Sequence, residues 1–236
     1  MSDPLITAKQ VTYIYPNNSV GLDNIDLEIY PGEILSVVGG SGAGKTTLIL
    51  VLSGILKPTR GYVNIRSSKL GVLLQNYDDM LIFPTVKDEI MDIASSIYRD
   101  SLGDQKIIES EIIERFSLKN LIHKRIYELS AGERKRIVLS IVFSRRPDIA
   151  LLDEPLTDLD NLGREILIRE IEDIKMRKGA VLIVSNEIIF PREISDTICI
   201  INRGKIIKCF DSVETCRFKE LLRENNIRIP SKEICC

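Results

Sequence analysis

The fold is decided by the stretch Gly39-Gly40-Ser41-Gly42-Ala43-Gly44-Lys45-Thr46-Thr47. It fits the pattern G-x-x-x-x-G-K-[ST] of phosphate-binding loops. Glycines allow the backbone N–H groups of such a loop to turn inward around a polyphosphate, and the helix that follows adds a partial positive charge. Lys45 can reach the terminal phosphates, and the Thr46 hydroxyl can bind Mg²⁺. The stretch therefore predicts a polyphosphate site with a bound Mg²⁺ ion.

The residues on either side support this prediction. The apolar run 34–38 predicts a buried strand that leads into the loop, and the apolar run 48–52 predicts a buried helix that follows it. A glycine-rich loop can also join a strand to a helix and bind nothing. The strand–loop–helix context is what favours phosphate binding here.

Composition limits the class of protein. The 236 residues carry a net charge of −2, which gives no electrostatic footprint for nucleic acid. The longest apolar runs fall far short of the roughly 18 residues that span a membrane, and we expect no signal peptide. The odd number of cysteines in a cytosol-like sequence predicts free thiols at Cys199, Cys209, Cys216, Cys235 and Cys236.

Strand-like and helix-like segments alternate along the chain. Helical spacing dominates residues 76–135, and further helices are expected near 161–178 and from about 212 to 224. This alternation predicts an α/β fold with a mostly parallel sheet. Strands are expected at 5–15, 25–29, 34–38, 62–65, 70–74, 149–152, 181–185, 197–201 and 205–209.

Two acids follow the apolar strand 149–152. Asp153 and Glu154 would lie at the carboxyl end of that strand, where α/β proteins bind ligands. Asp153 suits Mg²⁺ through a water molecule, and Glu154 suits the orientation or deprotonation of an attacking water. On their own the two acids could equally cap a helix. The phosphate loop upstream favours the catalytic interpretation.

The chain resembles the ATP-binding subunits of ABC transporters over nearly its whole length. Residues 39–47 are similar to the Walker A motif and residues 149–154 to Walker B. Gln75 stands at the position of the Q-loop, and Tyr15 stands where an aromatic ring stacks on adenine. Two further stretches resemble the signature motif and the D-loop: Leu129-Ser130-Ala131-Gly132-Glu133 and Thr157-Asp158-Leu159-Asp160.

This resemblance implies a P-loop NTPase (RecA-like) core with a mostly parallel sheet. It also implies a small N-terminal antiparallel β part and a helical signature subdomain. The whole chain, 1–236, would form a single ABC ATPase domain. Its nucleotide-binding core would comprise 1–75 and 145–211, its helical subdomain 76–144 and its C-terminal tail 212–236.

The resemblance also implies ATP and Mg²⁺ as cofactors, and a second ABC ATPase chain, identical or not, as partner. Each ATP would lie between the Walker A motif of one chain and the signature of the other. The Mg²⁺ contacts would be Thr46, Gln75 and Asp153, and the catalytic residues Glu154, Asn186 and Gln75. ATP would contact Tyr15, Gly39, Gly40, Ser41, Gly42, Ala43, Gly44, Lys45, Thr46 and Thr47. The signature contact would come from Ser130, Ala131, Gly132 and Glu133, and Asp160 of the D-loop would bridge the dimer.

Residues 75–86, QNYDDMLIFPTV, are similar to the QNPDDQLF-PTV stretch of energy-coupling factor (ECF) and cobalt-type importer ATPases. The tail from Lys219 to Pro230 is similar to that subfamily's C-terminal segment. The resemblance implies uptake of a vitamin or a metal ion, with residues 75–86 facing a transmembrane subunit at the cytoplasmic side of the membrane. Tyr77 and Met80 depart from the usual Pro and Gln.

Three further departures concern hydrolysis. Asn186 stands where the family has the switch histidine, and Asn cannot carry a proton. His123, the single histidine, falls in the helical segment and cannot replace it. Ala131 replaces a glycine, and its Cβ would be costly if the backbone there needs a positive φ. Glu133 replaces a glutamine, and we expect Arg134, Lys135 and Arg136 to offset its charge.

These departures predict slow hydrolysis in a homodimer, with a second ATPase chain that supplies the histidine. Two other functions remain open: a non-transport ABC ATPase, and a binding module driven by nucleotide without useful turnover. In isolation Ser130 could be an ordinary N-cap, Asp160 a solvated acid and Tyr15 a core or surface aromatic. The sequence does not encode the transported substrate.

Overall fold

The computed structural model describes residues 3–97 and 102–229. In the described chain the strands are β1 (Ile6–Ile14), β2 (Val20–Ile29), β3 (Ile34–Val38), β4 (Arg60–Ile65), β5 (Leu70–Leu73), β6 (Ile149–Asp153), β7 (Ala180–Ser185), β8 (Thr197–Asn202) and β9 (Lys205–Asp211). The α-helices are α1 (Lys45–Leu52), α2 (Val86–Ile97), α3 (Leu102–Arg115), α4 (Ala131–Phe143), α5 (Asn161–Met176), α6 (Ile189–Ile194) and α7 (Lys219–Glu224). Short 3₁₀ turns are η1 (Tyr77–Met80), η2 (Ile126–Glu128) and η3 (Ser212–Phe218).

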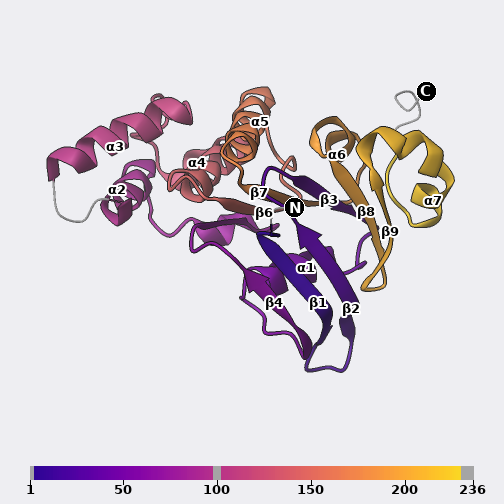
Figure 1. The fold of residues 1–236 in the computed structure, drawn as a ribbon. Helices are drawn as coiled ribbons and strands as arrows, with labels where there is room; N and C mark the ends of the chain where they lie inside the picture. Colours follow the sequence, from indigo (N-terminus) through magenta and orange to yellow (C-terminus); the bar gives the residue numbers. More distant parts are fainter. Residues whose placement is uncertain (1–2, 98–101, 230–236) are drawn as a thin grey trace. The chain divides into compact units, whose positions relative to one another are not determined.

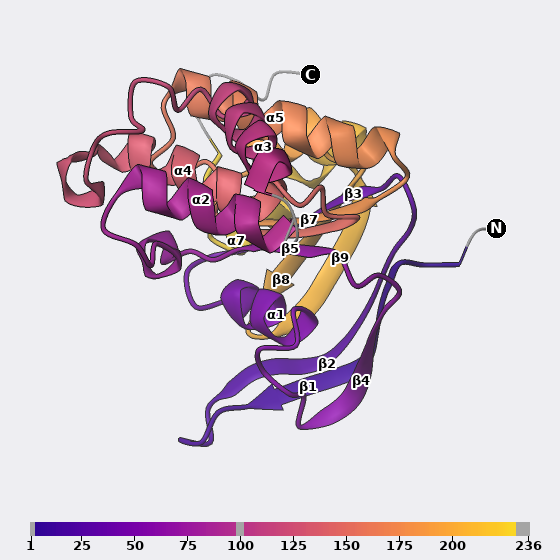
Figure 2. The same cartoon turned by 90° about the vertical axis from the view of Figure 1, so that its left-hand side faces the viewer.

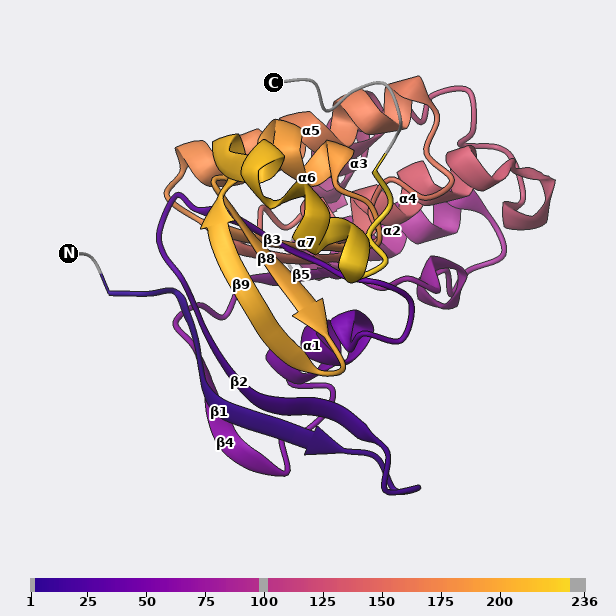
Figure 3. The same ribbon diagram turned by 90° about the vertical axis from the view of Figure 1, so that its right-hand side faces the viewer.

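Two sheets form the β structure. The larger has the strand order β5-β6-β7-β3-β8-β9, and the smaller has the order β2-β1-β4 (Figures 1 and 3). In the larger sheet every pairing is parallel except that of β8 with β9, whereas the smaller sheet is antiparallel throughout. The predicted α/β fold with a mostly parallel sheet and a small antiparallel part is confirmed.

The central strands are buried along their whole length. Every residue of β3, β6 and β7 is buried, as expected for a parallel sheet that is covered on both faces. Val38 lies opposite Ser185, and Asp153 lies opposite Val184. This register brings the loops after β3, β6 and β7 to one edge of the sheet.

The described chain divides into two compact units. The first comprises the described residues within Met1–Leu74, Asp148–Pro155 and Ile174–Cys236. The second comprises those within Gln75–Pro147 and Leu156–Asp173. Figure 2 shows α2, α3 and α4 of the second unit. These limits differ from the predicted boundaries: most of α5 belongs with the helical unit, and the tail belongs with the core.

An ion pair explains the place of α5. Glu170 on α5 is 2% exposed, and its carboxylate pairs with the Arg115 guanidinium at the end of α3. Arg169 donates to the Arg115 carbonyl oxygen as well. Burial of a carboxylate is tolerated only with such partners, so α5 is fixed to the helical unit by groups that sequence patterns do not pair.

The expectation of free thiols is wrong for two cysteines. Cys199 on β8 lies opposite Cys209 on β9 with a Cα–Cα distance of 4.0 Å, and the two form a disulfide instead of free thiols. The antiparallel register places them together, which a count of cysteines does not show. Cys235 and Cys236 lie outside the described residues. His123 lies in a turn after α3, inside the predicted helical segment. Within residues 3–97 and 102–229, no helix has the length and apolar character needed to cross a membrane.

Replacement of Arg115 by alanine should lower the free energy of unfolding by about 2–5 kcal/mol, because it leaves the buried Glu170 carboxylate with Arg169 alone. Urea unfolding of the purified chain measures this loss. The double change Arg115→Leu with Glu170→Leu should recover part of it. Arg66→Ala is the control, since Arg66 pairs with Asp3 at an exposed site. Equal losses in Arg115→Ala and Arg66→Ala would contradict the assignment.

Candidate functional site

The loop between β3 and α1 is held tightly by its neighbours. The Gly39 N–H donates to the Ser185 carbonyl oxygen at 3.1 Å. A Cβ at position 39 would lie 2.5 Å from the Ile201 carbonyl oxygen, and Gly44 has a φ of 108°. A side chain is therefore excluded by space at Gly39 and by backbone conformation at Gly44. The loop needs these glycines to keep its shape.

Lys45 is the central charge of this loop. Its side chain is buried, and its ammonium donates to the carbonyl oxygens of Gly39 at 2.9 Å and Gly40 at 3.0 Å. Burial lowers the pKa of Lys45, while the carboxylates of Glu154 and Asp153 act to raise it. The ammonium is thus folded over the loop, where an incoming anion can replace the two carbonyl contacts.

Both predicted acids lie at the same edge of the sheet. Asp153 ends β6 and is fully buried, and Glu154 follows it with a φ of 46°. The Glu154 Oε1 lies 3.9 Å from the Lys45 ammonium. Burial raises the pKa of Glu154, and Lys45 and the Asn186 backbone N–H partly oppose this rise. The parallel strands therefore bring a lysine and two carboxylates together within the first unit.

The threonines that begin α1 differ in exposure. Thr46 is exposed, as are Ser41 and Gly42, whereas Thr47 and Ala43 are buried. The Thr47 hydroxyl shares a 2.8 Å hydrogen bond with the Tyr15 hydroxyl. The half-buried Tyr15 ring also lies edge-on to Tyr13, with the ring centroids 4.9 Å apart. Tyr15 thus lies beside the loop, and its stacking on adenine stays a prediction.

Asn186 follows β7 and is half-buried. Its carbonyl oxygen accepts a hydrogen bond from the Arg228 N–H at 3.0 Å. Its backbone N–H faces the Glu154 carboxylate at the loop edge of the sheet. The role of Asn186 as the switch residue stays a prediction.

In the second unit, Ser130 caps α4. Its hydroxyl accepts from the Glu133 N–H at 3.2 Å, and the Glu133 carboxylate accepts from the Ser130 N–H at 2.8 Å. This reciprocal pair is a capping box. Ala131 is the first helical residue and is not among the residues with positive φ. The backbone strain expected from a Cβ at position 131 is therefore absent.

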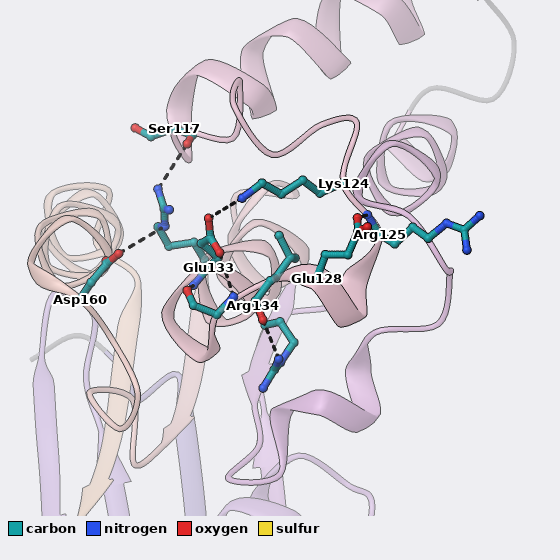
Figure 4. Close-up of polar contacts among 10 residues, drawn as sticks. Ser117, Lys124, Arg125, Glu128, Glu133, Arg134 and Asp160 are labelled. Carbon is teal, nitrogen blue, oxygen red and sulfur yellow. Dashed lines mark hydrogen bonds and ion pairs between the residues drawn. The ribbon is translucent and has the colours of Figure 1, made fainter.

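The charge of Glu133 is balanced by a residue that the sequence did not suggest. Lys124 donates to Glu133 at 3.0 Å (Figure 4). The offset expected from Arg134, Lys135 and Arg136 stays a prediction, and each of the three also has another contact. Arg134 pairs with Asp78 at 3.0 Å, Lys135 lies 4.4 Å from the centre of the Tyr77 ring, and Arg136 donates to the Ser117 carbonyl oxygen.

The segment after β6 is tied to the rest of the helical unit. The Asp160 carboxylate accepts from the Gly163 N–H at 2.7 Å at the start of α5 and lies 3.9 Å from the Arg136 guanidinium (Figure 4). The Tyr77 hydroxyl donates to Asp158 at 2.9 Å. Burial, with help from Asp158, raises the pKa of Tyr77 to about 12. Gln75, the first residue of this unit, is exposed.

Sequence reasoning missed Lys124, Tyr77 and the residues of the tail that contact Asn186. The sequence does mark Tyr77 as unusual, because it stands where the similar importer stretch has a proline. No sequence pattern marks Lys124, since its partner Glu133 lies on the far side of a turn.

A family model described as "ABC transporter" matches residues 22–157. A putative ABC transporter ATP-binding protein of Archaeoglobus fulgidus is 30% identical over 235 residues, which cover 94% of this chain and 97% of that protein. The energy-coupling factor transporter ATP-binding protein EcfA of Methanothermobacter thermautotrophicus is 30% identical over 242 residues. The match covers 96% of this chain and 77% of that protein.

Solved structures agree on the fold. The structure of cbiO1 from Clostridium perfringens, part of the ABC transporter complex cbiONQ, has a TM-score of 0.77 at 23% identity and covers 97% of each chain. A dimeric ATP-binding cassette, MJ0796, bound to ADP and phosphate, has a TM-score of 0.78 at 23% identity, with coverage of 88% of this chain and 98% of that one.

The likeness to these structures shows a P-loop NTPase fold. Because the family model covers more than half of the chain and relatives match almost all of it, the chain belongs to the ABC transporter family of ATP-binding proteins. Its homologues include the energy-coupling factor transporter ATP-binding proteins.

The Glu133 carboxyl should titrate below the ordinary value of about 4.5, since the Ser130 N–H, as the larger cause, and Lys124 both lower its pKa. The stability that this carboxylate adds is present above about pH 4.5 and is lost as the pH falls through the folded-state pKa. Carbon NMR titration should show the pKa rise in Lys124→Ala yet stay below the ordinary value. Lys119→Ala is the control, since Lys119 is an exposed lysine of the same segment. An unchanged pKa in Lys124→Ala would contradict the pairing.

Proposed function

We propose that this chain binds Mg-ATP and hydrolyses it to energise a membrane importer of the energy-coupling factor type. The observation that carries this proposal is the buried Lys45 ammonium, folded over the phosphate loop and 3.9 Å from Glu154. Family membership and the energy-coupling factor homologues support the coupling to transport.

The phosphate loop would hold ATP from Gly39 to Thr47, with Lys45 on the terminal phosphates. The exposed Thr46 hydroxyl and the buried Asp153 carboxylate fit Mg²⁺, a cation that prefers oxygen ligands and retains water. Gln75 is proposed as a further contact. When bound, Mg²⁺ supplies positive charge that stabilises the phosphates.

Glu154 is proposed as the group that orients and deprotonates the attacking water. Burial raises the pKa of Glu154, which makes its carboxylate a better base than an exposed glutamate. Asn186 can donate a hydrogen bond but takes up no proton. We therefore propose slow turnover by this chain alone, and faster turnover with a second ATPase chain that supplies a histidine.

In a dimer, Ser130, Ala131, Gly132 and Glu133 would contact the nucleotide of the partner, and Asp160 would bridge the two chains. The start of α4 offers N–H donors and a hydroxyl, as an anion site requires. A solved relative in this fold is dimeric with ADP and phosphate bound, which supports this arrangement.

Residues 75–86 are proposed to face the transmembrane subunit at the cytoplasmic side of the membrane. Ile82 is 79% exposed in this stretch, although it is apolar. The buried Glu89 carboxylate fixes the backbone of this stretch. It accepts hydrogen bonds from the N–H groups of Ile82 at 2.5 Å and Phe83 at 2.6 Å. The substrate class, a vitamin or a metal ion, rests on the likeness to this importer type.

Mg-dependent ATP hydrolysis by the purified chain tests the proposal. Lys45→Ala should weaken ATP binding, whereas Glu154→Gln should bind ATP and lose about 10²–10⁴-fold in turnover. In the wild type, turnover should fall as the pH drops through the Glu154 pKa, which burial places above that of an exposed glutamate. A wild-type chain that does not bind Mg-ATP would contradict the proposed function.

Asn186→His should raise turnover about tenfold or more, because it restores a group that can take up a proton. A new ionisation near pH 6–7 should then appear in the rate profile. Asn186→Ala serves as the comparison and should lower turnover. If Asn186→His has the turnover and pH profile of the wild type, the residue has no part in hydrolysis.

A further inference from the structure

Residues 225–229, here named the C-terminal strap, lie beyond the part of the chain that the family model covers. The Arg228 N–H donates to the Asn186 carbonyl oxygen at 3.0 Å, and the Ile188 N–H donates to the Arg228 carbonyl oxygen at 3.3 Å. Glu187 and Arg228 form a parallel β-bridge. The strap is thus paired, backbone to backbone, with the switch position.

The strap also lies on the phosphate loop. A Cβ at Gly40 would be 3.2 Å from the Asn226 Cβ and 3.3 Å from the Asn225 carbonyl oxygen. These distances are tighter than ordinary contacts, so the strap occupies the space that a side chain at position 40 would need. Asn226 has a φ of 56°, which turns the chain at the end of α7 and directs it along this loop.

The strap is firmly anchored in the first unit. Asn225 donates to the Leu221 carbonyl oxygen and accepts from the Asn202 side chain, both at 2.8 Å. Leu222 and Ile227 are buried in one apolar cluster with Val38, at the end of β3, and Ile188. Figure 3 shows α7 beside α6 and the β8–β9 pair. A segment with such contacts can hold its neighbours in place.

We propose that the C-terminal strap is a positioning element for ATP hydrolysis, which fixes the backbone of residues 186–188 against the phosphate loop. This proposal rests on the proposed function. Asn186 can act only by placing its amide, since it takes up no proton, and a misplacement of about 1 Å can cost 10²-fold in rate. Its backbone N–H also faces the Glu154 carboxylate. A shift of this peptide would therefore disturb two groups of the site at once.

Arg228→Pro tests this role, because proline lacks the N–H that binds the Asn186 carbonyl oxygen. The Arg228 side chain is exposed, so Arg228→Ala isolates its contribution from that of the backbone. Turnover of Mg-ATP should fall at least about tenfold in Arg228→Pro and less than about twofold in Arg228→Ala, with ATP affinity unchanged in both. Equal turnover in the two variants would overturn the proposal.

A second pair of variants keeps the test decisive if Arg228→Pro does not fold. Gly40→Ala should weaken Mg-ATP binding, because its Cβ presses on Asn226. Asn226→Gly removes that Cβ and keeps the positive φ, so the double variant should recover part of the affinity. No recovery would show that the strap does not bear on the phosphate loop.

Hydrogen exchange separates this proposal from the proposed function. Exchange at the Ile188 N–H should quicken in Arg228→Pro, with or without nucleotide. A wild-type chain without ATP binding or turnover contradicts the proposed function, whereas unchanged exchange at Ile188 in Arg228→Pro overturns the strap proposal.

Discussion

The parallel register of β6, β7 and β3 determines where each charged group of the phosphate site lies. Asp153 lies opposite Val184 and Val38 opposite Ser185, so the three strands end together. Every residue of these three strands is buried, as in a parallel sheet covered on both faces. Lys45, Glu154 and Asn186 then meet through strand pairing, although they come from distant parts of the chain.

Sequence alone predicted the parts of this site that local rules govern. The strand 34–38 agrees residue for residue with β3, and the acids after the strand 149–152 lie at its carboxyl end. Buried strands and glycine loops follow from apolar runs and from steric limits, which act over a few residues. The pairing of Cys199 with Cys209 and of Glu170 with Arg115 depends on register and helix packing, which no short pattern contains.

The helical unit shows how a departure from a motif can be accommodated locally. Glu133 brings a charge to the start of α4, yet this charge completes a capping box and meets Lys124. Ala131 needs no glycine conformation, because the helix has already begun there. The substitutions thus fit the backbone that surrounds them.

The strap also constrains the order in which the chain can reach its native state. During synthesis the phosphate loop and every strand of the large sheet leave the ribosome before residues 225–229. Contacts between such distant parts of a chain form late, because a long loop must close first. The nascent chain therefore passes through a stage in which the strands of the sheet can pair while residues 225–229 do not yet contact Gly40 and Asn186. At that stage nucleotide could bind before the Asn186 backbone is fixed.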